Sequence, residues 1–247
     1  RVFEKLLQQN FYTWTRTDTY SWLESYFPRL LPKEGAVLLM YGKEPQRISF
    51  ENKVKFAAWH LVEQLQKNKW EVEATESKLS GTYLNMNITG ISDLILKREG
   101  ERAIIDLKWS GATYRTNLVK NEEDIQLSLY NELYQNITGK LPYSGYYILS
   151  RARLVTRDNQ IFADVNALRT EADHKDIHQR LQFKLQSTLH WRLGQIQNGQ
   201  IEIRCKQTFR DLEFYYNEQE EELLNYLEMK NEDAAFDDYR TLIQLVD

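Results

Sequence analysis

The stretch GISDLIL at residues 90–96, followed by AIIDLKW at residues 103–109, places charged residues in two otherwise apolar segments. Both segments are predicted to be strands, and the short charged turn between them makes them a hairpin. Side chains two positions apart on a strand share a face, so Asp106 and Lys108 project together. The hairpin also brings Asp93 close to Asp106. These three residues are the candidate site.

Charged side chains on strands that are otherwise buried are costly unless they are paired or bind a metal. Two carboxylates and a lysine on adjacent strands form a site for a divalent cation, and oxygen ligands favour Mg²⁺ or Mn²⁺. Such an ion polarises a phosphoryl oxygen and generates hydroxide from bound water. A buried ion pair between Asp106 and Lys108 is the alternative, and a D-x-K pattern alone favours that alternative.

The sequence around this hairpin predicts an α/β domain. Between about residues 50 and 150 the expected order is helix, three strands, helix, strand, at residues 54–65, 70–75, 84–96, 103–109, 122–134 and 143–149. Outside this region, the apolar run Gly35–Tyr41 predicts a further strand. Helices are expected in four other stretches, at residues 2–31, 172–197, 218–229 and 235–245.

The helix after the hairpin carries Gln126 and Tyr130, an i,i+4 pair on one helical face. Together, G-x-x-D, I-I-D-L-K and Q-L-x-x-Y resemble the RecB-type branch of the PD-(D/E)xK nuclease superfamily. This branch includes the nuclease domains of RecB/AddB helicase–nucleases and the Cas4-like exonucleases. The predicted element order is similar to the restriction-endonuclease-like core of that family, a mixed central sheet flanked by helices.

The resemblance implies a role for each matching residue. Asp93 and Asp106 would bind the metal together with the backbone carbonyl of Leu107. Lys108 would be the catalytic lysine. Gln126 and Tyr130 would line the active site and contact DNA.

Three further residues are candidates for this site. His60 lies in a WHLVE segment that resembles the histidine-containing helix motif of the family, which makes it a possible further metal ligand. A packed or surface histidine is the alternative. Glu76 precedes the hairpin, where the family sometimes has an acid, and a solvated glutamate is its alternative. Arg115 is a candidate for contacting DNA phosphates, against the alternative of a solvated charge.

Cysteine content and motifs limit the cofactors and partners. Many RecB-like nucleases bind an iron–sulfur cluster, but Cys205 is the single cysteine, so no such cluster is expected. A helicase phosphate-binding loop is absent from the sequence. A helicase partner would therefore be another subunit or another domain. No apolar run approaches the ~18 residues of a membrane span, so we expect no membrane partner and a cytoplasmic location.

Charge divides the chain unevenly. Residues 211–247 carry 12 acidic and two basic residues, so the net charge of −4 separates into −10 there and +6 over residues 1–210. A mildly basic body can bind a polyanion locally despite the negative total. The acidic segment is either a solvated helix pair or a shield for a basic groove.

We therefore expect three parts. Residues 1–48 form a helical N-terminal addition packed on the core, residues 49–210 a PD-(D/E)xK nuclease-like domain, and residues 211–247 an acidic helical C-terminal tail.

The expected function is metal-dependent hydrolysis of DNA, at ends or single strands, in repair, recombination or defence. The alternative is a catalytically silent module that binds DNA or scaffolds a helicase complex. The intact motif set favours the enzyme. A structural adaptor is a third, more distant reading.

Overall fold

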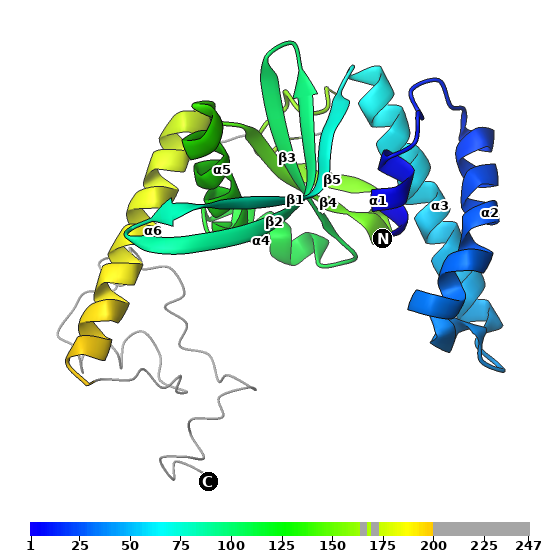
Figure 1. Cartoon of the computed structure of the whole chain (residues 1–247), viewed down its shortest axis with the longest axis horizontal. Helices are drawn as coiled ribbons and strands as arrows, with labels where there is room; N and C mark the ends of the chain where they lie inside the picture. Colours follow the sequence, from blue (N-terminus) through cyan, green and yellow to red (C-terminus); the bar gives the residue numbers. More distant parts are fainter. Residues whose placement is uncertain (164–166, 169–172, 200–247) are drawn as a thin grey trace, which may run out of the picture. The chain divides into compact units, whose positions relative to one another are not determined.

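The computed structural model describes residues 1–163, 167–168 and 173–199 (Figure 1). The chain divides into two compact units, residues 1–177 and 178–247. The described part of the second unit is the continuation of helix α6 (His174–Gln197), followed by a short turn up to residue 199. The candidate site lies in the first unit, which is described below.

A single five-stranded sheet organises the first unit, with the strands in the order β1-β2-β3-β4-β5. Their bounds are Glu71–Tyr83, Met86–Arg98, Glu101–Lys108, Tyr143–Ile148 and Arg153–Thr156. Strands β1, β2 and β3 form an antiparallel meander, β3 and β4 are parallel, and β4 and β5 are antiparallel. A parallel pair needs a crossover, which is supplied by α4 (Ala112–Lys120) and α5 (Ile125–Thr138).

Helices cover both faces of the sheet (Figure 1). On one face α1 (Val2–Leu7), α2 (Arg16–Glu34) and α3 (Glu44–Lys67) form the largest apolar core. On the other face α5 and α4 form two smaller cores. Strand alternation explains the division, because Ile105 enters the large core whereas its neighbour Ile104 enters a small one.

Local signals account for the helix ends. The side chain of Thr15 accepts a hydrogen bond from the Asp18 N–H, and the Asp18 carboxylate accepts one from the Thr15 N–H, so a capping box starts α2. Gly139 ends α5 in a left-handed conformation that glycine adopts without strain. The helix α3 begins at Glu44, earlier than its apolar pattern indicates, with Pro45 in the first turn.

The predicted α/β class with a restriction-endonuclease-like mixed sheet is confirmed. The strand predicted over Gly35–Tyr41 is wrong, because the stretch forms a 3₁₀ helix over Ala36–Leu39 between α2 and α3. The sequence analysis also missed α4 and β5, which are short, with nine and four residues. The N-terminal helices share one core with α3. The predicted tail helices at 218–229 and 235–245 lie outside the described residues.

Candidate active site

The site begins where the ladder between β2 and β3 ends. The last paired residues are Leu94 and Ile105, so the next positions along the strands place Asp93 beside Asp106. Here the strands are no longer joined backbone to backbone. Instead the Leu107 N–H donates to Asp93 Oδ2 at 2.6 Å. The aspartate side chain therefore replaces a strand carbonyl as the acceptor, which opens the sheet at this point.

Asp106 and Lys108 lie together at the end of β3, as the alternation predicts. The Asp106 side chain is only 2% exposed, and its Oδ2 lies 2.8 Å from Lys108 Nζ. This oxygen makes no hydrogen bond within the described part of the chain. A buried carboxylate with a single ionic contact retains unused acceptor capacity. The described residues therefore do not use the full acceptor capacity of this pair.

Burial perturbs Asp93. The pKa of its carboxyl group is raised to about 6, mainly because the group is buried, and the hydrogen bond from the Leu107 N–H opposes this shift. The negative charges of Asp106 and Glu76 contribute to the rise, and Lys108 opposes it. A bound cation would relieve this repulsion, because it favours the ionised form of each carboxylate.

Glu76 enters the site through an irregularity in β1. Thr75 pairs with Leu94 and Ser77 with Ser92, which places Glu76 opposite Asp93. Its backbone has a φ of 47°, a left-handed conformation that is uncommon for residues other than glycine. The Glu76 side chain is exposed. Three acids therefore occupy neighbouring positions on three adjacent strands.

Helix α5 is tied to β2 by the residues of the predicted motif. The Tyr130 hydroxyl accepts a hydrogen bond from Gln126 Nε2 at 3.0 Å and donates one to the Ile91 carbonyl at 2.8 Å. Gly90 makes this approach possible, because a Cβ at that position would lie 2.6 Å from Tyr130 Cε1. The glycine and tyrosine of the two motifs are thus in direct contact, two to three residues from Asp93.

Arg115 on α4 lies close to the same strand ends. Its guanidinium carbon is 5.3 Å from the ring centroid of Tyr146, the residue that pairs with Asp106 between β3 and β4. It also lies 4.8 Å from the centroid of Tyr114. Among the described residues, the buried Nε of Arg115 has no hydrogen-bond partner. Arg115 therefore brings positive charge to the neighbourhood of Asp106.

His60 lies on the other side of the sheet. Its Nδ1 is 3.0 Å from the Tyr147 hydroxyl, which itself donates to the Ala57 carbonyl at 2.9 Å. Because the tyrosine has one proton, His60 Nδ1 is the donor and Nε2 keeps a free lone pair. Burial lowers the pKa of His60, and Glu63 opposes this shift. No interaction with either aspartate is found in the described part of the chain.

The donor set fits a hard divalent cation. Mg²⁺ is usually bound through one or two carboxylates, with water and substrate phosphate completing its shell. Asp93 and Asp106, with the Leu107 carbonyl, fit this arrangement, and the buried Asp106 Oδ2 has capacity for a ligand. Over the described ranges, no group of three His, Cys, Asp or Glu side chains is placed to hold a metal ion.

The family model of the PD-(D/E)XK nuclease superfamily matches residues 6–208, and the chain belongs to this superfamily. Nucleases of this superfamily use divalent metals, and the mixed five-stranded sheet flanked by helices is consistent with their fold. No curated protein matches the chain. The predicted superfamily is confirmed, whereas its RecB/AddB/Cas4-like branch stays a prediction. Within the described residues, no helix is long and apolar enough to cross a membrane.

Proposed function

We propose that this protein is a Mg²⁺- or Mn²⁺-dependent nuclease of RecB type that hydrolyses phosphodiester bonds at DNA ends or in single strands. The observation that carries the proposal is the group Asp93, Asp106 and Lys108 at the opened end of the β2–β3 ladder. A purely structural ion pair would not need a second, destabilised carboxylate beside it. A carboxyl group with a raised pKa, here that of Asp93, beside a second carboxylate and a lysine is typical of a functional site.

A divalent ion held by Asp93, Asp106 and the Leu107 carbonyl would supply Lewis acidity to a phosphoryl oxygen and to bound water. Hydrolysis forms a bond between the water oxygen and phosphorus, breaks the bond to one ester oxygen, and leaves a proton on the departing oxygen. The Lys108 side chain is 26% exposed, so its ammonium group contacts both Asp106 and solvent. It orients the water and stabilises the negative charge that develops on the phosphate.

The flanking residues position the substrate in this proposal. Gln126 and Tyr130 hold α5 against β2 and face the DNA strand. Arg115 contacts a phosphate through its guanidinium group. Glu76 adds a third carboxylate that binds the ion directly or through water. His60 lies on the other side of the sheet against Tyr147, so the proposal gives it no role as a ligand of this ion.

Repair, recombination or defence is the proposed setting, with a helicase subunit or domain as a partner. Co-purification and size-exclusion assays with a helicase encoded in the same genome test this part. It is independent of the chemistry of the site.

The test is cleavage of end-labelled single-stranded and double-stranded DNA in Mg²⁺, Mn²⁺ or EDTA. We expect wild-type cleavage in a divalent metal and none in EDTA. Asp106→Asn, which keeps the shape of the side chain, should reduce the rate by at least about 10³-fold, because a metal ligand contributes several kcal/mol. Thermal melting confirms that the variant is folded.

The alternative function is a silent module that binds DNA or scaffolds a helicase complex. It is favoured by the absence of a preformed three-ligand cluster in the described residues. Folded wild-type protein that binds DNA without cleaving it in either metal would establish this alternative.

A further inference from the structure

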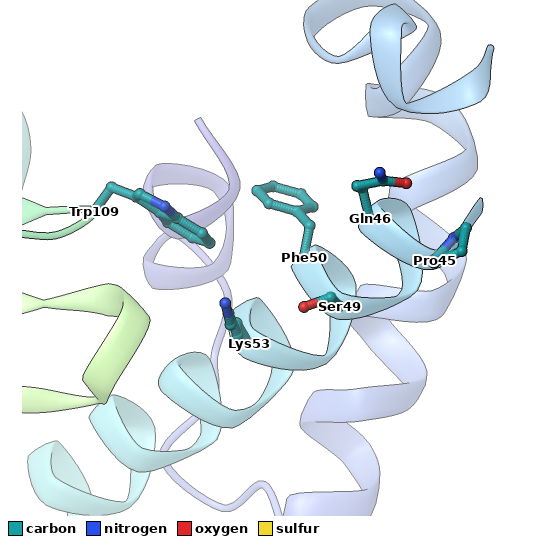
Figure 2. A pocket seen from close by; sticks show the side chains of 6 residues that line it. All are labelled: Pro45, Gln46, Ser49, Phe50, Lys53 and Trp109. Atoms are coloured by element: carbon teal, nitrogen blue, oxygen red, sulfur yellow. The ribbon is translucent and has the colours of Figure 1, made fainter. Parts of the chain in front are cut away.

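A solvent-open pocket lies beside the end of β3 and is formed with the first turns of α3 (Figure 2). It has a volume of about 400 Å³. This is within the range of about 300–1,000 Å³ that is typical of small-molecule sites. Six side chains line it, those of Pro45, Gln46, Ser49, Phe50, Lys53 and Trp109. None of them belongs to the site described above.

Two aromatic rings form its apolar wall. Trp109 follows the last residue of β3, and its side chain is directed toward Phe50 on α3 (Figure 2). The ring centroids are 5.3 Å apart with an interplanar angle of 33°. No third ring fits between them at this distance, so a planar ligand would stack on the open face of the indole. The tryptophan is 43% exposed.

The tryptophan is fixed at its backbone. The Ser150 N–H donates to the Trp109 carbonyl at 2.9 Å, which anchors the residue after the strand has ended. A rigid aromatic with an open face binds planar ligands at a low cost in conformational entropy. The Trp109 backbone is therefore anchored to Ser150, and its ring is supported on one side by Phe50.

The pocket also carries positive charge. Lys53 is exposed and projects from α3 on the side of Trp109 (Figure 2). Lys108, the catalytic lysine of the proposed function, is the direct neighbour of Trp109, so consecutive Cα atoms lie about 3.8 Å apart. A polyanionic chain that crosses the end of β3 therefore meets Lys108 and, at the next residue, the pocket with Trp109 and Lys53.

We propose that this pocket binds an unpaired nucleobase of the substrate strand, next to the phosphate that is cleaved, with the base stacked on Trp109 and an adjoining phosphate on Lys53. Base–aromatic stacking together with a cation that follows the backbone is the general mode of single-strand recognition. A paired base has both faces covered by its neighbours and cannot stack there. The pocket thus makes single-stranded DNA, or a frayed end, the preferred substrate.

This inference rests on the proposed function for its substrate, but it is tested by binding alone. A fluorescein-labelled thymidine 12-mer and an abasic strand of the same length are titrated with protein in EDTA and followed by fluorescence anisotropy. The proteins are wild type, Trp109→Ala and Trp109→Phe. Phe183→Ala is the matched control, because Phe183 is an aromatic with 64% exposure outside the pocket. Thermal melting accompanies each variant.

We expect Trp109→Ala to weaken binding of the thymidine strand by roughly 5- to 140-fold, the range that stacking of one base implies. The abasic strand should lose little, because it has no base to stack. Trp109→Phe should recover most of the affinity even if the alanine variant is unstable, and Phe183→Ala should bind like wild type. Lys53→Gln should reduce the slope of log K against log salt by about 0.7.

Equal losses for the thymidine and abasic strands would overturn the inference, as would wild-type affinity in Trp109→Ala or no binding of single strands by the wild type. An apolar protein segment as the true occupant would give one of these results. The binding assay does not need cleavage, so the two proposals can fail separately. If the base-dependent loss is seen but the protein never cuts DNA, the base-binding pocket is supported and the nuclease function is contradicted. If the protein cuts DNA but shows no base-dependent loss, the nuclease function is supported and the base-binding pocket is contradicted.

Discussion

The two halves of the β2–β3 hairpin have the same strands but opposite properties. Next to the turn, from Arg98 opposite Glu101 to Leu94 opposite Ile105, the ladder is continuous and its core-facing residues are apolar. Beyond Ile105 the ladder stops, and Asp93 accepts the Leu107 N–H in its place. The stable half holds the strands together, so the other half can tolerate buried, crowded charges. Stability and chemistry are thus divided along one pair of strands.

The largest expected difference between the halves concerns two lysines. Lys108→Ala should reduce the rate of DNA cleavage by about 10²- to 10³-fold, because a positioned cation that stabilises transition-state charge contributes that much. Lys97→Ala, in the paired half, should stay within about twofold. Lys97 is 44% exposed and makes only a surface pair with Glu71 at 3.4 Å. Single-turnover cleavage assays measure both. Comparable losses in the two variants would remove the functional distinction between the halves.

A second prediction concerns the packing that supports the charged half. Gly90→Ala should cost about 1–3 kcal/mol of unfolding free energy, since the added Cβ overlaps the Tyr130 ring. Urea denaturation measures this cost. Gly194→Ala on α6 is the control, because a Cβ there meets nothing within 4 Å and helix propensity improves.

A double mutant separates the cost of the overlap with the Tyr130 ring from the cost of strain in the β2 backbone. In a Tyr130→Ala background the glycine substitution should cost much less, because the overlapping ring is gone. A Gly90→Ala cost that is unchanged in this background would show that the strain lies in the backbone of β2 and not in the contact with α5.

The smallest expected effect is on thermal stability. The Asp93 pKa of about 6 is higher than its ordinary value of 3.8, so the folded state binds this proton more tightly than the unfolded state. The ionised carboxylate therefore destabilises the fold fully above about pH 6, and this penalty is lost progressively as the pH falls from about 6 to about 3.8. Asp93→Asn should melt about 2–4 °C above wild type at pH 7.5, and the two should converge near pH 4.

Melting curves between about pH 4 and 7.5 test this prediction, with Mg²⁺ as a second variable. The ion should stabilise wild type and leave Asp93→Asn nearly unchanged, because a ligand stabilises only the state that binds it. A pH-independent difference between the two proteins would place the destabilisation elsewhere in the site.

Much of the site can be predicted from the sequence because its signals are local. Strand alternation places Asp106 with Lys108, and helical spacing places Gln126 with Tyr130. The apolar run at Gly35–Tyr41 led to the wrong prediction of a strand, because a short apolar run does not indicate whether a partner strand is available. Glu76 depends on an irregular backbone that no residue pattern signals.

Contacts between segments that are distant in the sequence could not be predicted either. The pocket joins Trp109 to Phe50, which lies 59 positions earlier in the chain. The tryptophan directly after D-x-K is visible in the sequence as a candidate for stacking on a base. Only the fold shows that its ring contacts Phe50 and is still 43% exposed. The contact of Gly90 with Tyr130 similarly links two motifs that the sequence presents as separate.

The hydrogen bond from the Leu107 amide to Asp93 makes one backbone proton a reporter of the charge state of this carboxylate. Amide hydrogens exchange with deuterium when their hydrogen bond opens, at a rate set by local stability. Protonation of Asp93 weakens the acceptor of the Leu107 N–H. The Leu107 amide should therefore be less protected at low pH, when its exchange rate is compared with that of an unprotected amide at the same pH. A cation that orders the carboxylate slows it again. Deuterium uptake in the peptide that spans β3 therefore reads out metal occupancy without any substrate being turned over.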